Sequence, residues 1–235
     1  MQDTPNVAAI GGDFAQNFPT PVEDASGQSP AVDRISAKRI FDVTASALTL
    51  ICFLVLFLLV ALAIKVSSKG PVLFRHARIG RNGERFDCLK FRTMHVDGDE
   101  VLARHFAEHP DARTEWETTQ KLRRDPRVTA LGRVLRTSSV DELPQLINVL
   151  RGDMSLVGPR PIVQAEVVRY GDHFGDYCSV RPGLTGLWQV SGRSDTGYDE
   201  RVALDCEYVA RGSFAFDIVI ILRTLPAVFA ARGAC

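Results

Sequence analysis

Residues 43–64 read VTASALTLICFLVLFLLVALAI, an apolar run without a single charged side chain. A helix over this run is about 33 Å long, which is enough to cross a bilayer core of about 30 Å. The core helix of a soluble protein normally keeps a polar face, and this run has none. The run therefore predicts a membrane-inserted helix, which covers residues 36–68 when its flanks are included.

The way in which this helix enters the membrane is less clear from its residues. The basic residues on its flanks are Arg34, Lys38 and Arg39 before the run and Lys65, Lys69, Arg75 and Arg78 after it. The positive-inside bias then favours neither orientation of a spanning helix, whereas a re-entrant segment would place both flanks on one side. The run contains no Pro or Gly to break it, and only the hydroxyls of Thr44, Ser46 and Thr49 soften it. The composition leaves the topology open.

Charge along the chain argues for a membrane surface and against nucleic acid. The 235 residues include 28 basic and 28 acidic side chains, whereas a nucleic-acid-binding protein normally has a basic excess. Residues 1–33 hold five acids and no Lys or Arg, but residues 34–92 hold eleven bases against three acids. A basic stretch beside an apolar run is typical of contact with membrane lipid. We expect no nucleic-acid partner.

The chain divides into three predicted parts. Residues 1–35 are an acidic tail with few large apolar residues, so we expect them to be disordered. The membrane-inserted helix over residues 36–68 follows, and residues 69–235 form the expected globular domain. The predicted fold class is α+β and mainly α-helical. It combines the membrane-inserted helix with a globular domain that carries a small β-hairpin at the membrane interface.

Several elements of the globular domain are expected from local patterns. Two short strands, over residues 72–74 and 86–91, are predicted around a Gly-rich turn. A helix over residues 101–119 is expected to break at Pro110, and a second helix is expected over residues 140–150. A largely apolar segment near the end of the chain predicts a helix, either in the core or at the membrane interface.

The sequence Ser139-Val140-Asp141-Glu142 opens the helix expected over residues 140–150. A Ser followed three residues later by Glu is a capping box, so a purely structural role is one interpretation. The other interpretation is a metal and phosphate site, because Arg133, Arg136, Arg151 and Arg160 lie on both sides of the two acids. Successive helical side chains diverge by about 100°. One acid is then a nucleophile and the other a metal ligand or base.

Other side chains are candidates for binding phosphate. Arg160 lies between two prolines that restrict the backbone, so its guanidinium is held stiffly for phosphate or for supporting a turn. Lys90 and Arg92 alternate on a predicted strand, where they face either a diphosphate or solvent. Asp97-Gly98-Asp99 matches a short metal motif, although an Asp-Gly turn is the simpler interpretation. Asp205 is a candidate second carboxylate.

Cysteine and histidine spacing predicts no metal centre. The five cysteines are scattered and form no CxxC pair, so neither a zinc site nor a disulfide framework is expected. His105 and His109 have ligand spacing but lack the glutamate of the H-E-x-x-H motif, so we expect them on a surface helix.

These motifs together resemble the bacterial sugar transferases, the monotopic phosphoglycosyl transferases that act on polyprenyl phosphate. The matching stretches cover about residues 38–232 in order. They are KRIFD at 38–42, GPV at 70–72, RIGRNG at 78–83, KFRTM at 90–94, DELPQ at 141–145, GDMSLVGPRP at 152–161, RPGLTG at 181–186 and GR at 192–193. The chain length resembles the minimal form that starts exopolysaccharide repeat units.

The resemblance implies a two-step reaction. Asp141 attacks the β-phosphate of a UDP-sugar, releases UMP and holds a covalent phosphosugar until undecaprenyl phosphate collects it. Glu142 completes an Asp-Glu dyad, and Mg²⁺ is the expected cofactor. The expected metal ligands are Asp141, Glu142 and Asp205, and the expected phosphate-binding residues are Lys90, Arg92, Arg136 and Arg160. Galactose and glucose are the leading sugars, and nothing in the sequence distinguishes the hexose.

The resemblance also implies a location in the bacterial inner membrane, with the catalytic domain on the cytoplasmic face and a re-entrant helix. The family usually has Ser-Pro in the middle of that helix, and this chain has Leu54-Val55. The departure leaves the insertion geometry open. A homodimer is a possible assembly. The alternative function is a membrane-anchored, non-catalytic scaffold of the polysaccharide assembly machinery.

Overall fold

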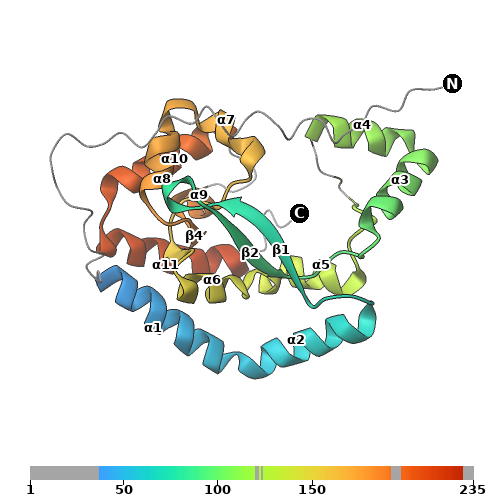
Figure 1. Cartoon of the computed structure of the whole chain (residues 1–235), viewed down its shortest axis with the longest axis horizontal. Helices are drawn as coiled ribbons and strands as arrows, with labels where there is room; N and C mark the ends of the chain where they lie inside the picture. Colours follow the sequence, from blue (N-terminus) through green and yellow to red (C-terminus); the bar gives the residue numbers. More distant parts are fainter. Residues whose placement is uncertain (1–36, 120–121, 123, 192–196, 230–235) are drawn as a thin grey trace. The chain divides into compact units, whose positions relative to one another are not determined.

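The computed structural model describes residues 37–119, 122, 124–191 and 197–229 (Figure 1). This part of the chain is mainly helical and contains two small two-stranded sheets, so the predicted α+β class is confirmed. The acidic tail expected over residues 1–35 lies outside the described residues.

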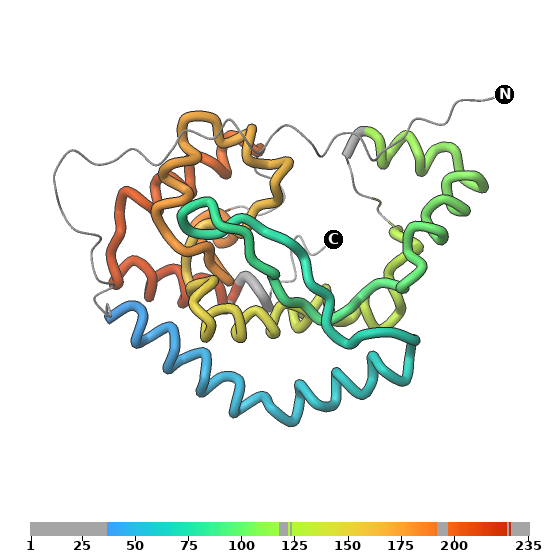
Figure 2. Tube along the Cα trace, viewed as in Figure 1, coloured from blue at the N-terminus to red at the C-terminus, as the bar shows by residue number. Residues whose placement is uncertain are grey.

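The apolar run forms two helices, α1 (Ala37–Cys52) and α2 (Leu54–Ser67), bent by 63° (Figures 1 and 2). The predicted membrane-inserted helix is thus divided near its middle, although no Pro or Gly lies at the break. The Thr49 hydroxyl donates to the Ala45 carbonyl at 2.8 Å, one turn before Phe53. A side-chain bond of this kind bends helices. Within the described ranges no single helix has the length and composition to cross a membrane, but the bent pair passes that test together.

Polar side chains attach α1 to the globular domain. Lys38 donates to Asp217 at 2.6 Å and to the Val157 carbonyl at 3.1 Å. Asp217 also accepts a 2.7 Å bond from the Tyr208 hydroxyl, and both Asp217 and Tyr208 are buried. The ammonium, carboxylate and hydroxyl therefore form one network that connects the start of α1 with α10 (Tyr198–Arg211) and α11 (Phe214–Phe229).

Arg39 and Asp42 attach α1 to the domain as well, one through a backbone carbonyl and one through a side-chain hydroxyl. Arg39 donates to the Val149 carbonyl at 2.6 Å, near the end of α6 (Gln145–Arg151). Asp42 is buried and accepts a 2.7 Å bond from the Ser155 hydroxyl. A charge placed inside a fold needs such partners. Both contacts connect α1 with segments that follow it by more than 100 residues.

Helix α2 makes a narrower contact. Val60 and Ile64 are buried against Phe91 and Leu135. Most of the remaining apolar side chains stay exposed, among them Val55, Leu58, Leu59, Leu62 and Val66. An exposed apolar surface of this kind indicates contact with a partner or with lipid.

The predicted hairpin is confirmed. Strands β1 (Leu73–Ile79) and β2 (Arg85–Phe91) pair antiparallel, from Leu73 opposite Phe91 to Ile79 opposite Arg85. The predicted break at Pro110 is confirmed as well, because α3 (Gly98–Glu108) ends before it and α4 (Pro110–Thr119) begins at it.

The helix expected over residues 140–150 is instead split. A short 3-10 turn, η3 (Val140–Glu142), precedes α6, and α5 (Ala130–Thr137) ends just before it. Ser139 lies in the left-handed region at φ 57° and makes no side-chain cap bond, so the capping-box interpretation is wrong. Pro144 lacks the N–H that a continuous helix would need. The two acids therefore lie on an isolated turn.

A second small sheet was not predicted. Strand β3 (Ser155–Val157) pairs parallel with β4 (Gly183–Thr185). The backbones approach so closely beyond β3 that a Cβ on Gly183 would lie 2.1 Å from the Gly158 nitrogen. Only glycine fits such an approach. This close approach of Gly158 and Gly183, called the glycine crossing below, fixes the position of the Pro-Arg-Pro segment that follows β3.

The C-terminal part is helical around a buried core. Its remaining elements are η4 (Gln164–Glu166), α7 (Val167–Tyr170), η5 (Gly171–His173), α8 (Phe174–Ser179) and α9 (Leu187–Ser191). Ile220 of α11 is fully buried, whereas Phe214, Val219 and Leu222 of the same helix stay exposed. Helix α11 is thus a core helix on one side and an exposed apolar surface on the other.

Candidate active site

Asp141 lies on the isolated turn η3 and is only 8% exposed. Burial and the neighbouring charge of Glu142 raise the pKa of Asp141 to about 6, while Lys90 and Arg136 oppose that rise. A carboxylate with a raised pKa is more basic, and hence a stronger nucleophile, than one in water.

Glu142, the second acid of the turn, has a fixed partner. Lys90 of β2 donates to its carboxylate at 2.5 Å. Burial alone would raise the pKa of Glu142, but Lys90, Arg160 and Arg78 together hold it below its ordinary value. Glu142 is therefore ionised at neutral pH. The pair brings the hairpin and the turn together, a contact of Lys90 that was not predicted.

A small pocket opens beside this pair and carries an excess of positive charge. Its lining residues are Arg78, Cys88, Lys90, Glu142, Gln145, Arg160, Pro161, Gly183, Leu184 and Gln189. Three of these side chains are cationic and one is anionic. Such a surface attracts a phosphate or diphosphate.

Arg78 was not singled out from the sequence. Its side chain is 12% exposed, and it donates to the Pro161 carbonyl at 3.0 Å and lies 3.8 Å from Glu166. Burial and the charge of Arg160 lower the pKa of Arg78. The signal that would have found it is the register of the hairpin, because β1 and β2 carry Arg78 and Lys90 to the same pocket.

Arg160 lies in the pocket lining, directly after the glycine crossing beyond β3. Its guanidinium lies over the Trp188 ring at 5.4 Å, and Arg201 lies over the same ring at 4.5 Å. Stacking on an indole holds the fork of an arginine in one plane. Arg160 also lowers the pKa of Glu142 and opposes the rise in the pKa of Asp205.

The other two candidate arginines have different surroundings. Arg136 donates to the Thr93 hydroxyl at 2.9 Å and contributes a charge that acts on Asp141. Arg92 is buried and donates to the Lys69 carbonyl at 2.6 Å and to the Ser68 carbonyl at 3.0 Å. Because β2 ends at Phe91, the alternation that would place Arg92 beside Lys90 does not extend to it. Its guanidinium instead holds the end of α2.

Asp205 lies apart from the other two predicted metal ligands. It is 4% exposed, and one of its oxygens accepts a 2.7 Å bond from Tyr170. The other oxygen is buried and has no hydrogen bond within the described part of the chain. Burial raises the pKa of Asp205 to about 7. Asp141, Glu142 and Asp205 do not form a group of converging metal donors in the described residues.

The remaining pair of acids still fits Mg²⁺. Carboxylate oxygens are the donors that this ion prefers, and it is usually held by one or two carboxylates together with substrate phosphates. Asp141 and Glu142 supply such donors on one turn, next to the cationic pocket.

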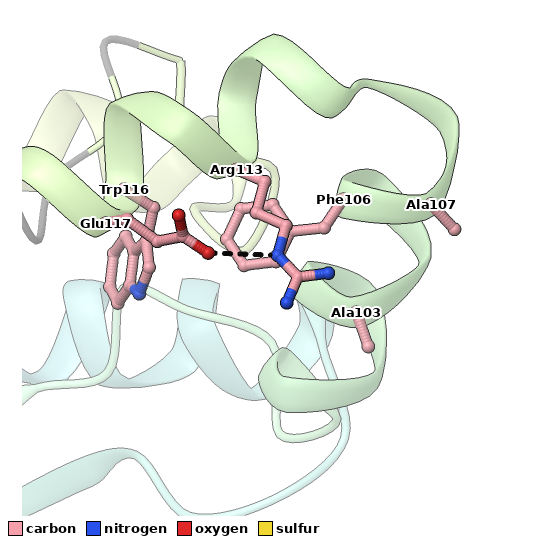
Figure 3. Close-up of a pocket in the computed structure, with 6 residues that line it drawn as sticks. All are labelled: Ala103, Phe106, Ala107, Arg113, Trp116 and Glu117. Atoms are coloured by element: carbon pink, nitrogen blue, oxygen red, sulfur yellow. Dashed lines mark hydrogen bonds and ion pairs between the residues drawn. The ribbon is translucent and has the colours of Figure 1, made fainter.

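A larger hollow lies between α3 and α4 (Figure 3). It measures about 450 Å³ and is lined by Ala103, Phe106, Ala107, Arg113, Trp116 and Glu117. Arg113 and Glu117 pair with each other at 3.1 Å. The carboxylate of Glu117 in this hollow is exposed and paired with Arg113, and Arg113 is the one cation of the lining, so we place the candidate site at the smaller cationic pocket.

Comparison with known proteins gives consistent matches. The bacterial sugar transferase model matches residues 33–231. The exopolysaccharide production protein ExoY of Rhizobium meliloti is 53% identical over 197 residues, which cover 84% of this chain and 87% of that protein. An undecaprenyl-phosphate galactose phosphotransferase of Salmonella typhimurium is 49% identical over 84% of this chain and 41% of its own length. A UDP-glucose:undecaprenyl-phosphate glucose-1-phosphate transferase of Caulobacter vibrioides is 45% identical over 88% of this chain and 75% of its own length.

Proposed function

Because the chain belongs to the bacterial sugar transferase family, we propose that it transfers a hexose 1-phosphate from a UDP-sugar to undecaprenyl phosphate. It is an enzyme, a sugar phosphotransferase. The proposed reaction is the first membrane step of exopolysaccharide synthesis, in line with the name of the relative from Rhizobium meliloti.

The observation that carries this proposal is the buried Asp141 beside a cationic pocket. In the first step the Asp141 carboxylate attacks the β-phosphorus of the UDP-sugar. The bond from that phosphorus to the bridging oxygen breaks, UMP leaves, and an aspartyl phosphosugar remains. In the second step a phosphate oxygen of undecaprenyl phosphate attacks the same phosphorus and releases Asp141. One carboxylate thus serves two substrates that never meet.

The cations of the pocket support both steps electrostatically. Phosphoryl transfer depends mainly on positioning and on neutralising the charge that develops on phosphate oxygens. Arg160 presents a planar fork that matches a phosphate, and Arg78 and Lys90 add two further charges. We propose these three residues, with Arg136 behind Asp141, as the phosphate-binding set.

Glu142 and Asp141 are the proposed ligands of Mg²⁺. Bound there, the ion would neutralise charge on the leaving phosphate. Glu142 stays ionised because Lys90 pairs with it, so it offers an anionic oxygen at neutral pH. Asp205 is a proposed support of the site through Arg160 and Tyr170 rather than a third ligand.

The decisive activity test is UMP release from a panel of UDP-sugars by detergent-solubilised protein. We expect release with UDP-galactose or UDP-glucose, and the panel identifies the hexose. Asp99→Asn is the matched control, because it removes an exposed carboxylate of the Asp-Gly-Asp motif at the start of α3. No UMP release with any sugar would leave the non-catalytic scaffold as the better explanation.

We further propose that α1 and α2 form a re-entrant membrane segment on the cytoplasmic face of the bacterial inner membrane. The supporting observations are the bend of 63°, the basic residues at both ends and the exposed apolar side of α2. The attachment of α1 to the catalytic domain also keeps its first turn at the surface of that domain.

Cysteine labelling tests this topology. The native cysteines are replaced, one is introduced near Ser26, and intact cells are treated with a membrane-impermeant maleimide. Protection until lysis supports the re-entrant segment. Labelling from the periplasm would show that the pair spans the membrane and overturn the proposal.

A further inference from the structure

Three side chains of different chemistry converge at the packing of α8 against α10. His173 ends η5, Asp176 lies in α8, and Cys206 lies in α10. The donor atoms of these three residues all lie within 4.8 Å of one another, and the imidazole Nδ1 lies 3.3 Å from the Asp176 carboxylate. None of them belongs to the site described above.

We propose that His173, Asp176 and Cys206 form a second metal site, which binds a borderline divalent cation, namely Zn²⁺. Nitrogen, oxygen and sulfur donors together suit Zn²⁺, whereas Mg²⁺ and Ca²⁺ prefer oxygen alone. Three protein ligands leave the fourth tetrahedral position to water. The site is independent of the transferase reaction.

The geometry requires only small side-chain movements. In a tetrahedral Zn²⁺ site with bonds of about 2.0–2.3 Å, neighbouring donors lie roughly 3.3–3.8 Å apart. The His173–Asp176 distance already has this value, and the remaining distances are at most 4.8 Å. His173 and Asp176 are exposed, so their side chains have room to adjust, whereas Cys206 packs against the core.

The backbone supports the site from two directions. His173 and Asp176 are three residues apart on consecutive helical turns, so they project to the same side. Helices α8 and α10 pack against each other around the core that includes Tyr177 and Val202. A bound cation would therefore connect two elements that are already in place, which keeps the ordering cost low.

Charge explains how the site would respond to pH. The groups that face the thiol are Asp176 and His173 from the packed segment and Asp205 from its own helix. Burial and the two carboxylates raise the pKa of Cys206, so the thiol is protonated without metal. Because Zn²⁺ binds the thiolate, binding releases a proton, and affinity rises with pH.

Co²⁺ titration of tag-free, chelator-treated, full-length protein tests the proposal. One Co²⁺ per chain is expected to produce a near-ultraviolet thiolate charge-transfer band, which Zn²⁺ removes and excess Mg²⁺ does not. Cys206→Ser is expected to abolish the band. The matched control is Cys178→Ser, which removes a free thiol of α8 outside the cluster and keeps the band.

Two further variants keep the test decisive. His173→Ala changes an exposed side chain and is expected to weaken Co²⁺ binding at least tenfold, even if Cys206→Ser fails to fold. Asp141→Asn is expected to keep the band, so a failure of the proposed transferase mechanism is seen separately. Absence of a thiolate band in the wild-type protein, or a band that survives Cys206→Ser, overturns the proposal.

Discussion

Two carboxylates of this protein share nearly the same burial and differ in almost everything else. Asp141 and Asp205 are 8% and 4% exposed, and burial raises the pKa of both, to about 6 and about 7. Asp141 lies on a three-residue turn after a left-handed Ser139 and faces cations. Asp205 lies inside a 14-residue helix and accepts a hydrogen bond from the Tyr170 hydroxyl.

The comparison shows that a raised pKa does not by itself identify a catalytic acid. The neighbours decide between the two roles. The charges of Glu142, Lys90 and Arg136 act on Asp141, which suits the proposed nucleophile, whereas a tyrosine hydroxyl bonds Asp205 inside a helix, which suits a supporting role. Mutation of each residue therefore has a different expected signature.

The largest expected effect is the loss of turnover in Asp141→Asn. A carboxamide keeps the shape of the side chain but is a very weak nucleophile, so UMP release should fall at least about a thousandfold, or roughly 4 kcal/mol in barrier. Circular dichroism and thermal unfolding should stay close to wild type. Activity within tenfold of wild type would contradict the nucleophile assignment.

Arg160→Lys should reduce UMP release by about 10–100-fold although the charge is kept, because lysine lacks the planar fork that binds phosphate and stacks on Trp188. Arg169→Lys is the matched control, since Arg169 also stacks on an aromatic ring, that of Tyr198 at 4.8 Å, but lies outside the pocket lining. Equal kinetics of the two variants would reduce Arg160 to a turn residue.

The pH dependence of turnover sharpens the role of Asp141. Its pKa of about 6 means that the reactive carboxylate is lost as pH falls below 6, so the rate should drop about tenfold per pH unit there. Glu142→Gln removes the neighbouring negative charge and so lowers the pKa of Asp141. The acid limb of the pH–rate profile, where the rate falls, should then move to lower pH. If the acid limb of the profile stays at the same pH in Glu142→Gln, Asp141 is not the group whose titration controls the rate.

Asp205→Asn should have the smallest effect on turnover, less than tenfold, and a characteristic effect on stability. The folded-state pKa of Asp205 is raised from 3.8 to about 7, so its contribution to stability is complete below pH 3.8 and is lost as pH rises through 7. The stability contributed by an asparagine at this position does not change with pH, because its side chain does not titrate. The Tm of Asp205→Asn relative to wild type should therefore increase from pH 4 to pH 8.

Asp99→Asn serves as the control for this measurement, because it removes an exposed carboxylate and should leave the Tm profile parallel to wild type. Parallel profiles for Asp205→Asn would show that the buried carboxylate is not protonated preferentially in the folded protein. A loss of turnover as large as that of Asp141→Asn would instead place both carboxylates in the chemistry.

Features encoded by local patterns were predictable from the sequence. The hairpin follows from alternating residues around a Gly-rich turn, and Pro110 marks the end of α3. Lys90, Glu142 and Arg160 were expected around one site, and they line one pocket. Each of these expectations depends on neighbouring residues or on strong sequence motifs.

Other features were not predictable. The bend at Phe53 is local, but it has no proline or glycine signal, and the Thr49 hydroxyl was expected only to soften the helix. The remaining features depend on long-range packing. Arg78 reaches the pocket only through the strand register, and Arg92 leaves it because β2 ends one residue earlier. The pairing of β3 with β4 joins segments 28 residues apart through a contact that no local pattern encodes.

The attachment of α1 couples the membrane segment rigidly to the globular domain. The Lys38–Asp217 pair and the Asp42–Ser155 bond join α1 to the body that holds Asp141, with no linker between them. With the bent pair inserted as proposed, the depth of the helices in lipid sets the height of Asp141 above the bilayer. A flexible tether would let that height fluctuate. Here bilayer thickness and lateral pressure become determinants of how well Asp141 aligns with a lipid-borne phosphate.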